Sequence, residues 1–130
     1  IQHLISLIQS KNNMKTINIK GKEYVPVVER VKEAHRLDPE LSITTEVVEF
    51  GNRISVRALV VFKGKIFNGH SQAEYGQGMM GNVALEVAET SAVGRALGFA
   101  GIGIDTGIAS ADEMRKVKTV AGQTDEDVPF

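Results

Sequence analysis

The stretch that decides the fold is residues 43–73, ITTEVVEFGNRISVRALVVFKGKIFNGHSQA. It holds three runs rich in β-branched and aromatic residues, which Gly51-Asn52 and Lys63-Gly64 separate. Two-residue turns of this kind join neighbouring antiparallel strands. We therefore predict a three-strand meander with strands at Ile43–Phe50, Arg53–Phe62 and Lys65–Ala73.

Two helices flank this meander. The segment Val25–Leu37 has apolar residues at helical spacing, and Asp38-Pro39 ends it. After a Gly-rich connection at 74–81, Asn82 is a good N-cap for a long helix over Val83–Phe99. That helix is rich in small residues, which permit close approach to the sheet or to a neighbouring helix: Ala88, Ala92, Gly94, Ala96 and Gly98.

Shorter elements complete the prediction. Lys15–Lys20 alternates and is expected to form a short N-terminal strand, Gly101–Ile104 an edge strand, and Ser110–Val117 a weak helix. The expected fold class is α+β, with an antiparallel sheet (the three-strand meander plus the short N-terminal strand) and two helices packed on it. An OB-like barrel is the alternative.

The two turns set the register, and the register decides which side chains share a face. One face is apolar and is expected to lie under the long helix: Ile43, Val47, Ile54, Val56, Ala58, Val60 and Phe67. The other face is polar: Phe50, Arg53, Ser55, Arg57, Asn68, His70 and Gln72. This polar face is either a nucleic-acid-binding surface or a solvated surface with Arg57 paired to Glu46.

Composition narrows the classes of function. The chain has 130 residues, enough for one modest domain, and no Cys, so it has no disulfide and no thiolate metal site. No catalytic motif is present and the His residues are scattered, so we expect no enzyme activity, no metal and no cofactor. No apolar stretch is long enough to span a membrane, and a cytoplasmic location is expected.

The charges are unevenly distributed along the sequence. The net charge is −1, yet residues 11–65 contain eleven Lys and Arg against seven Asp and Glu. The last six residues are Asp125, Glu126, Asp127, Val128, Pro129 and Phe130. A basic body with an acidic end suits a nucleic-acid binder that also recruits proteins, because an end that carries both a ring and a carboxylate suits capture by a basic pocket.

These features resemble those of known protein families. The acidic end resembles the C-terminal tip of bacterial single-stranded-DNA-binding proteins, which recruits replication and repair enzymes. The order strand–helix–three strands–helix, with AETSAVGRALGFAGIG in residues 88–103, resembles the Erf-type single-strand annealing proteins over roughly 15–105. Taken together, the chain most resembles small phage-encoded single-stranded-DNA-binding proteins of the lactococcal-phage type. The resemblance implies that Arg95 and Lys15 contact single-stranded DNA, whereas Gly94 stands where annealers often have a second cation.

The expected function is sequence-independent binding of single-stranded DNA in phage replication and recombination, in the host cytoplasm, by a homo-oligomer. Residues 14–109 form the binding domain, 1–13 an arm or non-native segment, and 110–130 a flexible tail whose tip recruits host replication or recombination proteins. The expected DNA contacts are Lys15, Phe50, Arg53, Arg57, Lys63, Lys65, Tyr75 and Arg95, with Phe50 and Tyr75 as stacking rings.

Three alternatives remain open from the sequence, and the last of them is an adaptor whose tail matters and whose body binds protein. The first is an annealing protein that speeds the pairing of complementary strands. The second is a dinucleotide-binding enzyme fragment, because Gly76–Gly81 matches G-x-G-x-x-G between a strand and a helix. Against the second, the preceding strands form tight hairpins, and no second mononucleotide half fits in the remaining length.

Overall fold

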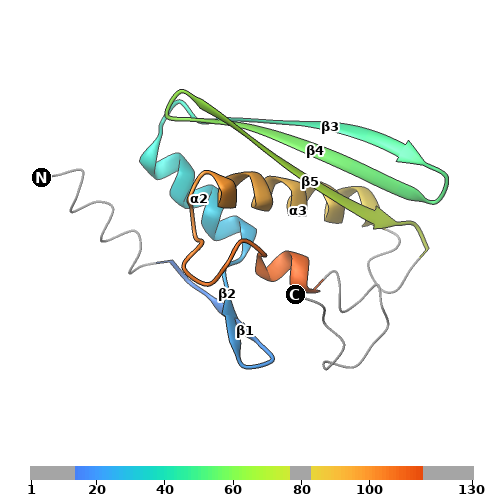
Figure 1. Cartoon of the computed structure of the whole chain (residues 1–130), viewed down its shortest axis with the longest axis horizontal. Helices are drawn as coiled ribbons and strands as arrows, with labels where there is room; N and C mark the ends of the chain where they lie inside the picture. Colours follow the sequence, from blue (N-terminus) through green and yellow to red (C-terminus); the bar gives the residue numbers. More distant parts are fainter. Residues whose placement is uncertain (1–13, 77–82, 116–130) are drawn as a thin grey trace, which may run out of the picture.

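A computed structural model describes residues 14–76 and 83–115 of the chain. A long three-stranded antiparallel sheet lies over two helices, and a small two-stranded hairpin stands apart from it (Figure 1). In chain order the elements are β1 (Ile17–Ile19), β2 (Lys22–Tyr24), α2 (Val27–Leu37), β3 (Ser42–Phe50), β4 (Arg53–Phe62), β5 (Lys65–Glu74) and α3 (Ala84–Phe99). The predicted α+β fold class is confirmed.

The predicted meander is confirmed, with the strand order β3-β4-β5. Phe50 pairs with Arg53 and Phe62 pairs with Lys65, so both turns have two residues, as expected. At the second turn Lys63 and Gly64 have φ values of 51° and 78°, the pair of positive angles that matches the right-handed twist of the strands. Since the register follows from these turns, the two predicted sheet faces are also confirmed.

Helix α3 lies along the apolar face, over β4 and β5 (Figure 1). Ala88, Ala92 and Ala96 are fully buried there. The approach is so close that a Cβ on Gly69 of β5 would stand 2.2 Å from the carbonyl oxygen of Ala92. The predicted role of the small residues is therefore confirmed. Val47, on the same face of β3, stays 43% exposed because α3 covers the other two strands.

Helix α2 packs beside α3 and shares its small-residue surface. A Cβ on Gly94 would meet Cγ2 of Val27 at 2.5 Å, so this glycine allows the two helices to touch. The end of α2 is joined to the sheet by Asp38, whose Oδ2 accepts a 2.7 Å hydrogen bond from the backbone N–H of Lys63. This bond, followed by the one from the N–H of Glu40, lowers the pKa of the Asp38 carboxyl.

Three sequence expectations need correction. The N-terminal strand does not join the meander: it pairs with β2 across a turn at Lys20-Gly21, where both φ values are positive, so the chain closes a hairpin of its own. No strand forms at 101–104, where residues 101–103 make a turn and bends. Within residues 14–76 and 83–115 the meander stays an open sheet with β3 and β5 at its edges, and not the alternative OB-like barrel.

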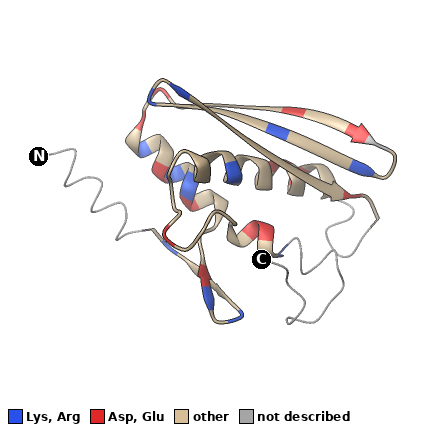
Figure 2. Cartoon of the chain, viewed as in Figure 1, with Lys and Arg blue, Asp and Glu red and all other residues tan. Residues whose placement is uncertain are grey.

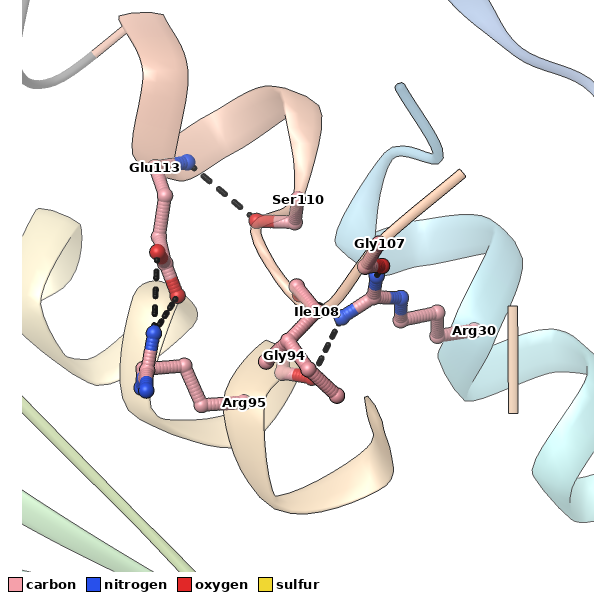
Figure 3. A network of polar contacts seen from close by, with 7 residues as sticks. All are labelled: Arg30, Gly94, Arg95, Gly107, Ile108, Ser110 and Glu113. Carbon is pink, nitrogen blue, oxygen red and sulfur yellow. Dashed lines mark hydrogen bonds and ion pairs between the residues drawn. The ribbon is translucent and has the colours of Figure 1, made fainter. Parts of the chain in front are cut away.

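The loop after α3 is shaped by Arg30 of α2, a fully buried side chain. Its guanidinium donates hydrogen bonds of 2.8–3.2 Å to four backbone carbonyls, those of Gly94, Gly103, Gly107 and Ile108. Figure 3 shows this guanidinium between α3 and the loop. Within 101–104, the carbonyl of Gly103 therefore has a partner other than a neighbouring strand.

Candidate nucleic-acid interface

The face of the sheet turned away from both helices presents a central row of polar side chains. Arg57 of β4 lies between Glu46 of β3 and His70 of β5 in the strand register. Its Nη2 donates a 3.1 Å hydrogen bond to Oε2 of Glu46. Both side chains are about half exposed or more, at 48% and 64%. Exposed pairs of this kind contribute only about 0–1 kcal/mol to stability, so Arg57 is available to an anion that outcompetes Glu46.

A second row lies nearer the β3–β4 turn. Arg53 donates from Nε to Oε1 of Glu74 at 3.2 Å, and its side chain is 54% exposed. Phe50 occupies the opposite position on β3. Figure 2 shows the arginines of β4 beside the acids of β3. The structure thus brings Arg53 and Arg57 together on one face, as the sequence predicts, and gives each a carboxylate partner.

Tyr75, the other expected stacking residue, lies just after β5 and is 38% exposed. Its hydroxyl donates a 3.2 Å hydrogen bond to Oε1 of Glu49. Partial desolvation, followed by this bond and the charges of Glu49 and Glu86, raises the pKa of Tyr75. Glu49 pairs with Ile54, so it belongs to the helix-covered face, and Tyr75 therefore reaches toward that side of the sheet.

Lys63 and Lys65 lie at the other end of the sheet, at the β4–β5 turn and the start of β5, and both are exposed. The Lys63 ammonium stands 5.5 Å from the centre of the Phe62 ring. The end of α2, with exposed His35 and Arg36, is tied to this turn through Asp38. These lysines therefore mark a separate basic end and do not extend the row around Arg57.

Arg95 and Lys15 lie on the helix side of the sheet. Arg95 of α3 approaches both oxygens of Glu113, at 3.4 and 3.3 Å from Nη1 (Figure 3). Its guanidinium stands 5.5 Å from the centre of the Phe99 ring. Glu113 is buried, with a side chain 4% exposed, so this pair anchors the residues after the loop. The backbone N–H of Lys15 donates to Glu29 at 3.4 Å. Neither residue shares a surface with Arg53 and Arg57.

Sequence reasoning overlooked Arg30. Its signal was its spacing, because it lies three residues after Val27 and four before Ala34, on the buried side of α2. A cation in such a stripe is either paired or bonded to backbone carbonyls. Arg30 is thus a structural residue and not a contact for a ligand.

Four further features bear on what the protein can bind: its charge balance, metal ligands, membrane spans and the Gly-rich match. Residues 14–76 and 83–115 hold twelve Lys and Arg against thirteen Asp and Glu. In these ranges no group of acids and histidines is arranged to hold a metal ion, and no helix there is long and apolar enough to cross a membrane. Gly76, the first residue of the G-x-G-x-x-G match, follows an antiparallel strand. The rest of the match lies within 77–82, which are outside the described residues, and so are the arm at 1–13 and the tip Asp125–Phe130.

A family model described as "Slr1353 N-terminal dsRNA-binding domain-like" matches residues 29–100, which run from α2 through the meander to the end of α3. This range is more than half of the chain. No curated protein and no solved structure matches.

Proposed function

The chain belongs to the Slr1353 N-terminal dsRNA-binding domain-like family, and from this premise we propose that it binds nucleic acid, with single-stranded DNA as the preferred form. The observation that carries the proposal is the open outer face of the β3-β4-β5 sheet. Neither helix covers it (Figure 1), and it combines two exposed arginines with other hydrogen-bonding side chains: Ser55, Asn68, His70 and Gln72.

The geometry favours one strand over a duplex. Arg53 and Arg57 are four residues apart on β4, about 13 Å along the strand at the usual rise per residue, so both can contact the backbone of one strand that runs along the sheet. Double-stranded RNA-binding domains instead span about 16 base pairs through many sugar and phosphate contacts. The described residues have no excess of cations over acids, and the exposed cations are divided between separate surfaces.

Charge also sets the strength of the interaction. Each arginine must exchange a glutamate for a phosphate, so a single copy would bind weakly and without sequence preference. Several copies on one strand would gain affinity through effective concentration, and we therefore include a homo-oligomer in the proposal. Binding of double-stranded RNA is the second candidate, since the family description favours it.

The class of nucleic acid is tested by fluorescence anisotropy with a labelled oligo-dT, a DNA duplex and an RNA duplex of equal length, each at two salt concentrations. We expect the tightest binding to oligo-dT and a fall in affinity at the higher salt, because phosphate contacts release counterions. Tightest binding to the RNA duplex would transfer the proposal to the second candidate. Absence of binding to all three would overturn it.

The surface is tested by a pair of substitutions with opposite expected effects. Arg57→Ala should weaken binding to oligo-dT and reduce the log–log salt slope by about 0.7, the value for one lost phosphate contact on a single strand. Glu46→Gln should strengthen binding, because the carboxylate that competes for Arg57 is gone. Both are measured by salt titration of the same anisotropy signal.

Arg36→Ala is the matched control. Arg36 is also an exposed arginine paired with a glutamate, Glu33, but it lies on α2. It should leave both the affinity and the slope within error of the wild type. If Arg36→Ala lowered the slope and Arg57→Ala did not, the interface would lie at the basic end around Lys63 rather than on the sheet.

A further inference from the structure

Strand β3 is the least covered strand of the main sheet. All of its residues from Thr44 to Glu49 are exposed, whereas β4 beside it buries every second side chain. Helix α3 lies mainly over β4 and β5 (Figure 1), so no layer packs on this part of β3. The neighbours Val47 and Val48 therefore stay exposed on opposite faces of the strand.

The outer edge of β3 faces no other strand in the part of the chain that the structure describes. Phe50 and Arg53 flank a two-residue turn, and such a pair exchanges both of its backbone hydrogen bonds. With a period of two, the backbone groups of the even-numbered residues of β3 point to β4, and those of Ile43, Thr45 and Val47 point outward. This edge can therefore pair with one more antiparallel strand.

The edge lacks two of the usual devices that keep strands from pairing. Proteins shield an edge with proline, with a bulge or with charged side chains. The register with β4 runs without a break from Ser42 to Phe50, so β3 has no bulge, and it contains no proline. Its charges are Glu46 and Glu49, so a strand that pairs here must not bring a carboxylate to either position.

A second copy of β3 meets this condition. We propose that two copies of the chain pair through β3, antiparallel, about a two-fold axis that passes through Thr45. Ile43 of each copy then lies opposite Val47 of the other, and Glu46 lies opposite Thr44. The paired positions include those whose backbone groups point outward, so the pairing forms about six backbone hydrogen bonds.

The charges of β3 select this register over its neighbours. An axis at Glu46 would place the two copies of that carboxylate directly opposite each other, and like charges in that position are destabilising. An axis at Val47 would place Glu46 opposite Val48 and would leave a single apolar pair on the other face. With the axis at Thr45 the two Ile43–Val47 pairs are apolar, and Glu49 lies beyond the paired stretch, which ends at Ile43.

The pairing joins the outer faces of the two sheets. Neighbouring strands lie about 4.8 Å apart and each residue advances about 3.4 Å, so the Arg57 positions of the two copies are about 16 Å apart on one continuous sheet. One strand of nucleic acid can contact both. The inference therefore rests on the proposed function, because it gives the homo-oligomer proposed there a surface and a symmetry.

Single cysteines test the register, because the chain has no Cys of its own. Thr45→Cys places two thiols across the axis, where the Cα atoms of a bonded pair are about 5.5 Å apart, within the range of a disulfide. Mild oxidation of the full chain should therefore give a disulfide-linked dimer on a non-reducing gel.

Glu49→Cys is the matched control, an exposed residue of the same strand and face. Its two copies would be about 27 Å apart, so it should stay monomeric on that gel. Absence of linkage for Thr45→Cys, equal linkage for both variants, or linkage for Val47→Cys alone would overturn the proposed pairing.

Analytical ultracentrifugation without nucleic acid tests the dimer itself. From roughly 1 to 100 μM the chain should show a monomer–dimer equilibrium, since so small an interface binds weakly. Val47→Pro removes an N–H that points outward, so the pairing of β3 with β4 remains, and each dimer loses two backbone bonds by symmetry. The dimer of this variant should dissociate at least about tenfold more readily, with an unchanged far-ultraviolet circular dichroism spectrum.

Glu49→Pro is the matched control, because its N–H also points outward but lies beyond the paired stretch, and it should dimerise like the wild type. If Val47→Pro alters the spectrum, the cysteine variants decide. A wild-type chain that stays monomeric at the highest concentration would overturn the dimer even if it binds oligo-dT. If the chain dimerises in this register and binds no nucleic acid, the proposed function fails and the β3 interface stands.

Discussion

Replacing Gly69 by alanine should destabilise the protein by about 3 kcal/mol or more, the upper part of the range for overpacked cores. The new methyl would stand 2.2 Å from the carbonyl oxygen of Ala92 and 2.4 Å from the backbone nitrogen of Ala96. Both atoms belong to the backbone of α3, which cannot rotate out of the way as a side chain can. The helix would have to lift from β4 and β5 and lose contact with the buried core.

The sign of this effect is informative, because alanine is normally the better residue inside a strand. Urea unfolding followed by circular dichroism measures the change in the free energy of unfolding. Asn68→Ala is the control: it is the preceding residue of β5, faces outward and is exposed, and should change stability by less than about 0.5 kcal/mol. An unchanged midpoint for Gly69→Ala would show that α3 does not rest on β5 as described.

Arg30→Ala should cost on the order of 4 kcal/mol, since hydrogen bonds to charged groups are each worth about 1.5–3 kcal/mol. The guanidinium holds the carbonyls of Gly103, Gly107 and Ile108, which would be left without their donor, and a cavity would remain between α2 and α3. Burial lowers the pKa of Arg30, although Glu113 and Asp112 partly offset this. The Arg30 side chain is therefore held by the geometry of its hydrogen bonds as well as by its charge.

Two variants isolate that geometry in thermal and urea unfolding. Arg30→Lys keeps the charge but lacks the planar fork that reaches several carbonyls at once, so its stability should be intermediate. Lys32→Ala removes a cation of the same helix whose side chain is 67% exposed, and should cost less than about 1 kcal/mol. If Arg30→Lys matched the wild type, charge alone would explain the role of Arg30.

Local sequence patterns predicted the meander because turns and strand periodicity depend on residues that are close together in the sequence. The turns Gly51-Asn52 and Lys63-Gly64 each set the pairing of the residues beside them, and a period of two then assigns every side chain of β4 to a face. Ile54, Val56, Ala58 and Val60 are all fully buried, as that pattern requires. The small residues of α3 similarly indicated close packing, although not which neighbour each would meet.

The candidate interface was predicted only in part. Arg53 and Arg57 share a face because one strand carries both. Arg95 and Lys15 were added from a family resemblance, and the structure places them on the helix side, Arg95 in a pair with Glu113. The N-terminal strand was assigned to the main sheet, but it closes a hairpin with β2, since a three-residue strand does not itself specify its partner.

By itself, then, the sequence determined the meander, its two faces and the presence of two helices, because turn chemistry and periodicity act between near neighbours. Only the tertiary structure decided what the polar side chains contact. Arg30 reaches carbonyls more than sixty residues away, and Arg95 of α3 pairs with Glu113 of the helical turn at 111–115. Such contacts depend on how elements distant in sequence pack together, and the free energy of burial, rather than any local preference, selects that packing.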